Sequence, residues 1–286
     1  MIKKLYCANE YFSPQATLEC GQTFRFWQED GGYFICSGER ACRLRQDGKR
    51  NEIVCREEDA EYFRAYFDLD RNYGQIVDWA KAMPEDCIRR AAESGRGIRI
   101  LNQDAEEMIL TFILSQNNNI PRIRSMVAKV CERAGEEREL EGRAYRTFPR
   151  AEKLAALTQS EYISMGFGYR AAYFREAACR LAKEDIRALK VLPTVQLREQ
   201  LMTYKGIGEK VADCILLFGF GRTDAFPVDV WMERVYRECF GGRERSRRKI
   251  AQAMQSRFGR YSGYIQQYLF YFEREGSEKN GADHDQ

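Results

Sequence analysis

The spacing of apolar residues changes once along this chain, near residue 60, and that change limits the folds open to it. Up to about residue 56, four short runs have the character of strands: residues 23–28, 32–38, 41–46 and 51–57. An Asp-Gly pair between the last two runs favours a tight hairpin. We therefore predict an antiparallel sheet in this part of the chain.

From Ala60 onward the apolar residues recur at helical spacing instead. The sets are Tyr62, Phe63, Tyr66 and Phe67, then Met108, Ile109, Phe112 and Ile113, then Ile123, Met126, Val127 and Val130. Nearly everything after residue 100 is predicted to be helical. Helices should begin after Asp104, at Pro193-Thr194 and after Ser246.

The predicted fold class is thus α+β, with a small N-terminal antiparallel β-sheet domain in residues 1–100. A mainly α-helical domain follows in residues 101–275, and the polar residues 276–286 are expected to form a disordered tail. The chain has 286 residues, of which 44% are hydrophobic and 31% charged, so it can bury a substantial core.

The net charge of +3 is compatible with a local basic face but does not identify a partner. No signal-like N-terminus and no apolar run of about 18 residues is present, so we expect no membrane association. The expected location is the cytoplasm, near the nucleoid, if the source is prokaryotic, and the nucleus if it is eukaryotic.

Ten cysteines include no CxxC pair, and several lie inside apolar patterns, which favours reduced thiols in a core. The only histidine, His284, lies in the polar tail. This excludes Ser-His and Cys-His catalytic triads and argues against a histidine-based zinc site. No side-chain metal site is predicted.

Two glycines, Gly206 and Gly208, stand between two helical patterns. Glycines allow a tight turn there, and its free amides can hold a phosphate oxygen together with the N-terminus of the next helix. An ordinary turn between helices would have the same pattern, so these glycines alone do not establish a binding site.

Lys210 opens the second of these helices, and Asp229 is placed to cap the next one after Pro227. The helix dipole and partial burial would lower the pKa of the lysine and favour its neutral, nucleophilic form. A nearby carboxylate would oppose that shift. The separation of 229 − 210 = 19 residues allows both side chains to face one cleft, although a solvated lysine and a plain helix cap would also fit.

The order of hairpin, lysine, VADC and PVDV resembles the helix-hairpin-helix and Gly/Pro-Asp motif of the DNA glycosylase superfamily, with Lys205 where proline is frequent. Three further segments, residues 20–27, 113–123 and 165–174, resemble the 8-oxoguanine DNA glycosylase/AP lyase family. A fourth, residues 261–270, is similar to the last helix of that family. The resemblance covers nearly the whole chain.

This resemblance implies a bifunctional enzyme that flips 8-oxoguanine out of duplex DNA, opposite cytosine, and excises it. Lys210 would attack the sugar and form a Schiff base, and β-elimination would then nick the strand. Asp229 would stabilise positive charge on the sugar. Phosphates would be bound by Gly206, Gly208 and Lys205, and by a basic segment with Arg243, Arg245, Arg247, Arg248 and Lys249.

The resemblance also implies a set of contacts to the flipped base. Because N7 carries a proton in 8-oxoguanine but accepts hydrogen bonds in guanine, one acceptor can tell the two apart. The carbonyl of Gly21 would be that acceptor. Phe270 would stack on the base, Gln266 would bond its Watson-Crick edge, and Cys214 would lie on the opposite face. From the sequence alone, Gly21 could equally be a strand bend, and Phe270 and Cys214 core residues.

On the other strand, Asn117 would occupy the space left by the flipped base, and Tyr169 would act as a wedge. Arg122 and Arg170 would read the unpaired cytosine, whose O2 and N3 accept hydrogen bonds. The three consecutive asparagines that begin at Asn117 also predict a turn between helices. Without the resemblance both arginines would pass as solvated helix charges.

Two positions depart from the family pattern: Trp231 stands where histidine is typical, and Thr23 replaces the usual serine. Only Cys239 follows the aspartate motif, so we expect no iron–sulfur cluster and no other cofactor, although a cation could bind at the hairpin. The expected partner is double-stranded DNA containing 8-oxoguanine, bound by a monomer.

Two other functions remain open at this stage. An alkylpurine DNA glycosylase would share the architecture, but such relatives generally lack lysine at position 210. A non-enzymatic helix-hairpin-helix DNA-binding protein would need neither Lys210 nor Asp229.

Overall fold

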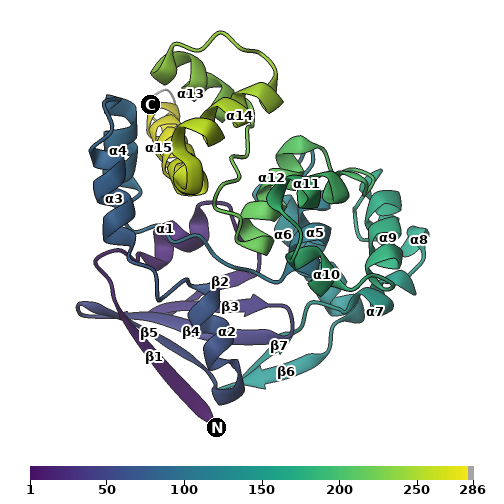
Figure 1. Ribbon diagram of the computed structural model, residues 1–286. Coiled ribbons are helices and arrows are strands. Elements are labelled where there is room, and N and C mark those ends of the chain that lie inside the picture. Colours follow the sequence, from purple (N-terminus) through teal and green to yellow (C-terminus); the bar gives the residue numbers. More distant parts are fainter. Residues whose placement is uncertain (283–286) are drawn as a thin grey trace.

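A five-stranded antiparallel sheet forms the base of the molecule in this computed structural model, which describes residues 1–282 (Figure 1). The strand order is β1-β5-β4-β3-β2. The strands are β1 (Ile2–Ala8), β2 (Phe26–Glu29), β3 (Gly32–Ser37), β4 (Arg40–Asp47) and β5 (Arg50–Arg56). The predicted sheet is confirmed, and the Asp-Gly turn joins β4 to β5.

Strand β1 was not among the predicted strands, because it is an edge strand that is mostly exposed. Leu5 is its one buried side chain, and its two lysines lie on the surface. The core beneath the sheet contains Ile35, Leu44 and Ile53, against which helix α2 (Ala60–Tyr66) packs Phe63. Short α1 (Pro14–Glu19) lies ahead of β2 in the chain.

The rest of the chain is mainly helical, as predicted. The helices are α3 (Tyr73–Lys81), α4 (Asp86–Ser94), α5 (Ala105–Leu114), α6 (Ile120–Ala134), α7 (Ala151–Ala155), α8 (Gln159–Ser164), α9 (Arg170–Leu181), α10 (Ile186–Lys190), α11 (Thr194–Met202), α12 (Glu209–Phe220), α13 (Val230–Phe240), α14 (Arg247–Phe258) and α15 (Ser262–Ala282). Asp104 caps α5 by accepting a hydrogen bond from the amide of Glu107, as the sequence indicated. Helix α5 is buried on every side, so it forms the centre of the helical body.

Helices α3 and α4 precede residue 100, yet they stand beside the last helix, α15 (Figure 1). The rings of Tyr73 and Tyr264 meet edge to face with centroids 5.6 Å apart, and those of Trp79 and Tyr261 lie 4.6 Å apart. The first hundred residues therefore contribute to both ends of the fold. Helix α15 also continues to Ala282, past the expected boundary at residue 275, and residues 283–286, with His284, lie outside the described residues.

A second, two-stranded sheet corrects the prediction that the region after residue 100 is almost wholly helical. Strands β6 (Glu137–Leu140) and β7 (Arg143–Arg146) form a hairpin that lies against the main sheet (Figure 1). Leu140 and Tyr145 are buried there with Phe34 of β3. The pattern was missed because two four-residue strands carry too few apolar residues to show alternation.

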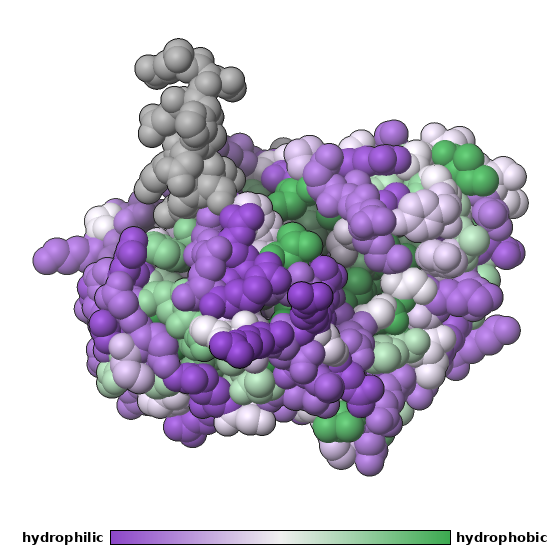
Figure 2. Space-filling model, turned by 90° about the horizontal axis from the view of Figure 1, so that it is seen from above, coloured by the Kyte–Doolittle hydropathy of each residue, from purple (hydrophilic) through white to green (hydrophobic). Residues whose placement is uncertain are grey.

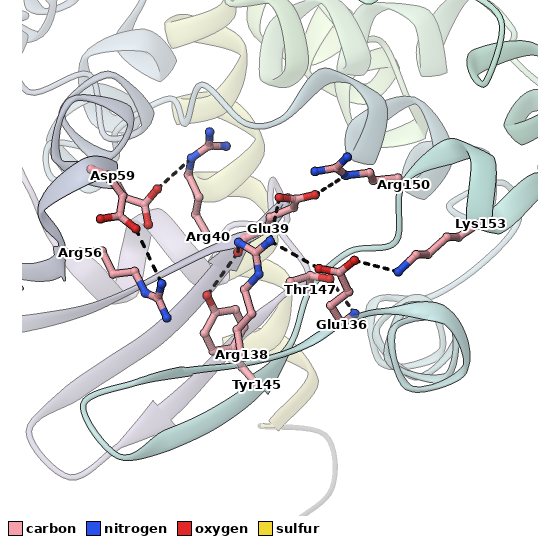
Figure 3. A network of polar contacts seen from close by, with 12 residues as sticks. Glu39, Arg40, Arg56, Asp59, Glu136, Arg138, Tyr145, Thr147, Arg150 and Lys153 are labelled. Atoms are coloured by element: carbon pink, nitrogen blue, oxygen red, sulfur yellow. Dashed lines mark hydrogen bonds and ion pairs between the residues drawn. The ribbon is translucent and has the colours of Figure 1, made fainter.

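A network of charges fastens this hairpin to the sheet and to α7 (Figure 3). Glu39 pairs with Arg138 at 2.9 Å and with Arg150 at 2.5 Å, and Glu136 pairs with Lys153 at 2.8 Å. Each of these side chains is partly exposed, so each pair contributes little by itself. Their shared partners make the attachment a network.

A buried ion pair joins the segment before β2 to helix α5. Arg25 Nη1 lies 3.1 Å from Glu107 Oε2, and both side chains are almost fully buried. Burial raises the pKa of Glu107, and the guanidinium of Arg25 opposes that shift. Removing one partner would leave an uncompensated charge and cost about 3–5 kcal/mol.

Among the helices of residues 1–282, none combines the length and the apolar character that a membrane span requires.

Candidate active site

The predicted hairpin lies between α11 and α12, and Gly206 requires its glycine there. Its φ of +86° is in the left-handed region, and a Cβ would lie 2.6 Å from Nε2 of Gln116 and 2.9 Å from the ring of Tyr173. No described side chain caps α12 at Gly208, so the first amides of this helix remain available to a ligand. Lys205 is exposed and pairs with Glu176 at 2.8 Å.

Asp229 caps α13, as the sequence predicted. Its Oδ1 accepts hydrogen bonds from the amides of Trp231 and Met232, both at 3.0 Å. Oδ2 takes no part in these two bonds. The cap therefore fixes the carboxylate and leaves one oxygen for other contacts.

A small cavity of about 60 Å³ brings the predicted catalytic and base-binding residues together. Its lining comprises Cys20, Gly21, Phe112, Lys210, Cys214, Phe218, Pro227, Asp229, Gln266, Gln267 and Phe270. Every residue assigned to catalysis or to the lesion base is in this set. The face of the molecule in Figure 2 is hollowed near its middle, where apolar side chains lie among hydrophilic ones.

Sequence reasoning missed five of the lining residues. Phe112 and Phe218 stack with ring centroids 5.9 Å apart and form an apolar wall. Both belong to helical apolar patterns that resemble any core. Cys20 and Gln267 adjoin predicted site residues and lie in two of the segments that resemble the family, and Pro227, the fifth, stands two positions before Asp229.

Gln266 presents an unpaired acceptor to the cavity. The residue is 5% exposed, and its Oε1 is buried without a hydrogen-bond partner among the described residues. A buried polar atom without a partner is costly, so a ligand that donates a hydrogen bond would be stabilised here. The Watson-Crick edge of a guanine-type base carries such donors.

Gly21 and Phe270 meet on one side of the cavity. Gly21 has φ +87°, and a Cβ at this position would lie 4.0 Å from Cε1 of Phe270. The left-handed backbone accounts for a glycine without any function. Its place in the cavity adds that the residue is close to where a base stacked on Phe270 would lie.

Lys210 and Cys214 are titratable neighbours in the cavity. The pKa of Lys210 is raised by Cys214 and by the charge of Asp229, while burial and Arg247 lower it. Burial raises the pKa of the Cys214 thiol. The raised pKa favours the ammonium form of Lys210, which must lose a proton before it can act as a nucleophile. The sequence left open whether the helix dipole and burial or a nearby carboxylate would dominate, and the net shift of the Lys210 pKa is upward.

The residues predicted to face the other strand gather around the turn between α5 and α6. Asn117 is exposed at φ +43°, and Tyr169 is 55% exposed with its hydroxyl 3.4 Å from the carbonyl of Gln116. Arg122 is exposed, and its Nη2 lies 3.4 Å from the carbonyl of Gly166. The asparagine turn is confirmed, and Asn119 caps α6.

Arg170 differs from the expectation of a solvated charge. It is 3% exposed, and its guanidinium donates to the carbonyls of Gln116, at 2.8 Å from Nε, and of Asn117, at 2.8 Å from Nη2. These bonds hold the asparagine turn. A contact of Nε or Nη2 with DNA would compete with these bonds, whereas Nη1 takes part in neither of them.

The basic segment at α14 is largely paired with acidic side chains. Arg247 lies 2.5 Å from Glu233, and Lys249 lies 3.6 Å from Glu244. Trp231 is half-buried under the guanidinium of Arg234, 5.2 Å from its ring centroid. Within residues 1–274, whose side chains the structure describes, no cluster of three or more His, Cys, Asp or Glu could hold a metal ion. The expectations on cofactors and on a hairpin cation stay predictions.

The fold and this cavity together define a helix-hairpin-helix protein of base excision repair. Residues 110–260 match the model of the HhH-GPD superfamily of base excision DNA repair proteins. Residues 4–109 match the model of the 8-oxoguanine DNA glycosylase N-terminal domain. The chain belongs to the 8-oxoguanine DNA glycosylase family of this superfamily.

Individual relatives agree with this assignment. The N-glycosylase/DNA lyase of Saccharomyces cerevisiae is 35% identical over 251 residues, which are 76% of this chain and 65% of the yeast protein. The 8-oxoguanine glycosylase/lyase of Clostridium acetobutylicum, in complex with double-stranded DNA containing cytosine opposite 8-oxoG, superposes with a TM-score of 0.89. It is 33% identical, and the match covers 97% of this chain and 98% of that one.

Proposed function

We propose that this protein excises 8-oxoguanine from duplex DNA, opposite cytosine, and nicks the resulting abasic site. The observation that carries the proposal is the shared cavity, in which Lys210 and Asp229 lie beside Gly21, Gln266 and Phe270. A nucleophile, a carboxylate and a set of base contacts thus converge on one space. Membership of the 8-oxoguanine DNA glycosylase family supports the same activity.

The damaged base would enter this cavity after leaving the helix. Extrusion costs a few kcal/mol, which must be offset by contacts in the pocket. Phe270 offers a ring for stacking, and the unpaired Oε1 of Gln266 accepts from the Watson-Crick edge. The carbonyl of Gly21 accepts from N7–H of 8-oxoguanine, whereas N7 of guanine would present a lone pair to it.

Lys210 then supplies the nucleophile. Its neutral amine forms a bond to C1′ while the bond from C1′ to the base breaks, and the base leaves with the electron pair. Loss of an amine proton and opening of the sugar ring give the Schiff base. Removal of a proton from C2′ expels the 3′ phosphate and nicks the strand. Asp229 stabilises the positive charge that develops on the sugar.

Two arginine side chains of the protein would donate hydrogen bonds to the base on the opposite strand, and cytosine is the base that they would favour. Arg122 is exposed and can donate to O2 and N3 of the unpaired base, and Arg170 can join it once the asparagine turn rearranges. Tyr169, which is 55% exposed, is the wedge that fills the duplex.

A duplex carrying one 8-oxoguanine opposite cytosine tests the proposal. We expect excision and strand nicking in a single turnover, and a covalent protein–DNA adduct when borohydride is present. Base release without an adduct would indicate a monofunctional glycosylase. Release of 3-methyladenine with no action on 8-oxoguanine would indicate an alkylpurine glycosylase. Binding without release of any base would indicate a DNA-binding protein only.

A further inference from the structure

The loop that carries Gly21 is held by the side chain of the next residue, Gln22, which is fully buried. Its Nε2 donates to the carbonyl of Thr17 at 2.9 Å and to that of Arg99 at 2.7 Å. Its Oε1 accepts from the amide of Leu101 at 2.9 Å. One amide group thus joins the end of α1 to the extended segment that precedes α5.

The backbone on both sides of Gly21 is also fixed. The carbonyl of Gln22 accepts from Nε2 of Gln103 at 2.7 Å, and the carbonyl of Cys20 accepts from Nε2 of Gln267 at 3.2 Å. Gln267 lies on α15 next to Gln266. The loop is therefore tied to the helix that carries the other base contacts.

These ties matter because recognition depends on a single carbonyl. A glycine at φ +87° has more backbone freedom than any other residue, so it cannot hold its own carbonyl in place. Sites of this kind need their reacting groups held within about 0.5 Å by surrounding hydrogen bonds. Neither α1 nor β2 includes Gly21, so no helix or sheet bonding provides that support.

We propose that Gln22 is a positioning residue for 8-oxoguanine recognition. Its amide, together with Gln267, fixes the Gly21 carbonyl where it meets N7–H of the extruded base. Gln22 is absent from the cavity lining, so it acts through Gly21 alone. The inference rests on the proposed excision of 8-oxoguanine.

The substitution Gln22→Glu tests this role, because it keeps the size of the side chain and removes the two amide donors. In one preparation, single-turnover excision of 8-oxoguanine is compared with nicking of a duplex that already contains an abasic site. The second reaction needs Lys210 but no base. We expect excision to fall by about 10- to 100-fold, as for a small displacement of a reacting group, and abasic-site nicking to stay at the wild-type rate.

Asn51→Asp is the matched control. Asn51 is also a fully buried amide of the N-terminal sheet, and its Nδ2 donates to the carbonyl of Phe12 at 2.8 Å, away from the loop of Gly21. A loss of folded protein would lower both reactions together in either variant. Only a misplaced Gly21 lowers excision alone.

Equal loss of both reactions in Gln22→Glu, or no loss of either, would overturn the inference. If that variant does not fold, Gln103→Glu decides, since Gln103 is absent from the cavity lining and the substitution removes the donor to the carbonyl of Gln22. The same split between the reactions supports the inference, and a parallel loss overturns it. A wild-type protein that does not excise 8-oxoguanine would instead refute the proposed function.

Discussion

The lesion cavity and the cluster predicted to face the other strand differ in how far their polar groups are already hydrogen-bonded within the protein. In the cavity, Lys210, Asp229 and Gln266 already face one space, and Oε1 of Gln266 has no partner within the described chain. In the opposite-strand cluster, formed by Asn117, Arg122, Tyr169 and Arg170, the buried arginine already donates to two backbone carbonyls.

We therefore expect the two halves of the proposed site to bind DNA in different ways. Filling the lesion cavity would supply a hydrogen bond to Oε1 of Gln266, which lacks one. In the opposite-strand cluster, Nε and Nη2 of Arg170 already donate within the protein, so a contact of these atoms to DNA would replace an existing hydrogen bond and would add less free energy of binding. Preference for the opposing base is therefore expected to be smaller, and easier to alter, than the requirement for the lesion pocket.

The largest expected effect is the loss of covalent trapping in Lys210→Gln. The substitution removes the amine and leaves the rest of the cavity, so binding to lesion DNA should persist. Borohydride trapping followed on a denaturing gel measures the change. Lys49→Gln is the control, because Lys49 is an exposed lysine in the turn between β4 and β5 and does not line the cavity. Trapping of Lys210→Gln at the wild-type level would refute the assignment of the nucleophile.

Asp229→Asn should slow excision by roughly 10- to 100-fold, since it removes a charge that stabilises the transition state. Asparagine is as good a helix cap as aspartate, so the melting temperature should change little. Single-turnover rates measure the effect. A rate equal to that of the wild type would leave Asp229 with no role beyond the cap of α13.

The preference for cytosine should be about tenfold or more over adenine, since an unpaired buried donor costs about 1–3 kcal/mol. Arg122→Ala should narrow this ratio more than it weakens binding to undamaged duplex, because its contact is to a base. Rates on duplexes with 8-oxoguanine opposite each of the four bases provide the measurement. Equal rates in the wild type would remove the cytosine-reading roles and leave the lysine chemistry intact.

Arg170→Ala should destabilise the fold, whereas Arg122→Ala should not. It leaves the carbonyls of Gln116 and Asn117 without their buried donor, so we expect a loss of about 1–3 kcal/mol in the free energy of unfolding. Arg122→Ala, at an exposed position, should leave that free energy unchanged. Denaturant unfolding of both variants measures the difference in stability. Equal stability of the two variants would contradict the structural role assigned to Arg170.

The smallest expected effect is on the pH dependence of excision. Because the pKa of Lys210 is raised, the neutral amine becomes more abundant as pH increases, and the rate should rise on the alkaline side. Asp229 contributes to that raised pKa, so the profile of Asp229→Asn should lie at lower pH. Superimposable profiles would show that the carboxylate does not influence the amine.

Much of this architecture is readable from the sequence, because its signals are local. The Asp-Gly turn, the cap at Asp104 and the glycines of the hairpin each act within a few residues, and each lies where it was predicted. The cavity residues were predicted from resemblance rather than from spacing. Lys210 and Asp229 alone were compatible with a surface lysine and a helix cap.

Other features depend on partners far along the chain, and no local pattern reveals them. Arg170 is buried by carbonyls 53 and 54 residues away. In the sequence, Gln22 is an ordinary polar residue. In the fold it is buried, and its amide bonds to the backbone of Arg99 and Leu101, which lie 77 and 79 residues later. A glutamine whose side chain is buried and one whose side chain is solvated look the same in a sequence, so only the tertiary structure distinguishes them.

The bond between Gln267 and the carbonyl of Cys20 joins residues 247 positions apart. During synthesis the nucleophile, its carboxylate and the hairpin leave the ribosome before α15, which supplies Gln266 and Phe270. A nascent chain that ended before Ser262 would carry Gly21, Lys210 and Asp229 but would lack the two side chains proposed to bond the edge of the base and to stack on it. The last helix to be made therefore completes the lining of the cavity, and closing the pocket is coupled to joining the two ends of the fold.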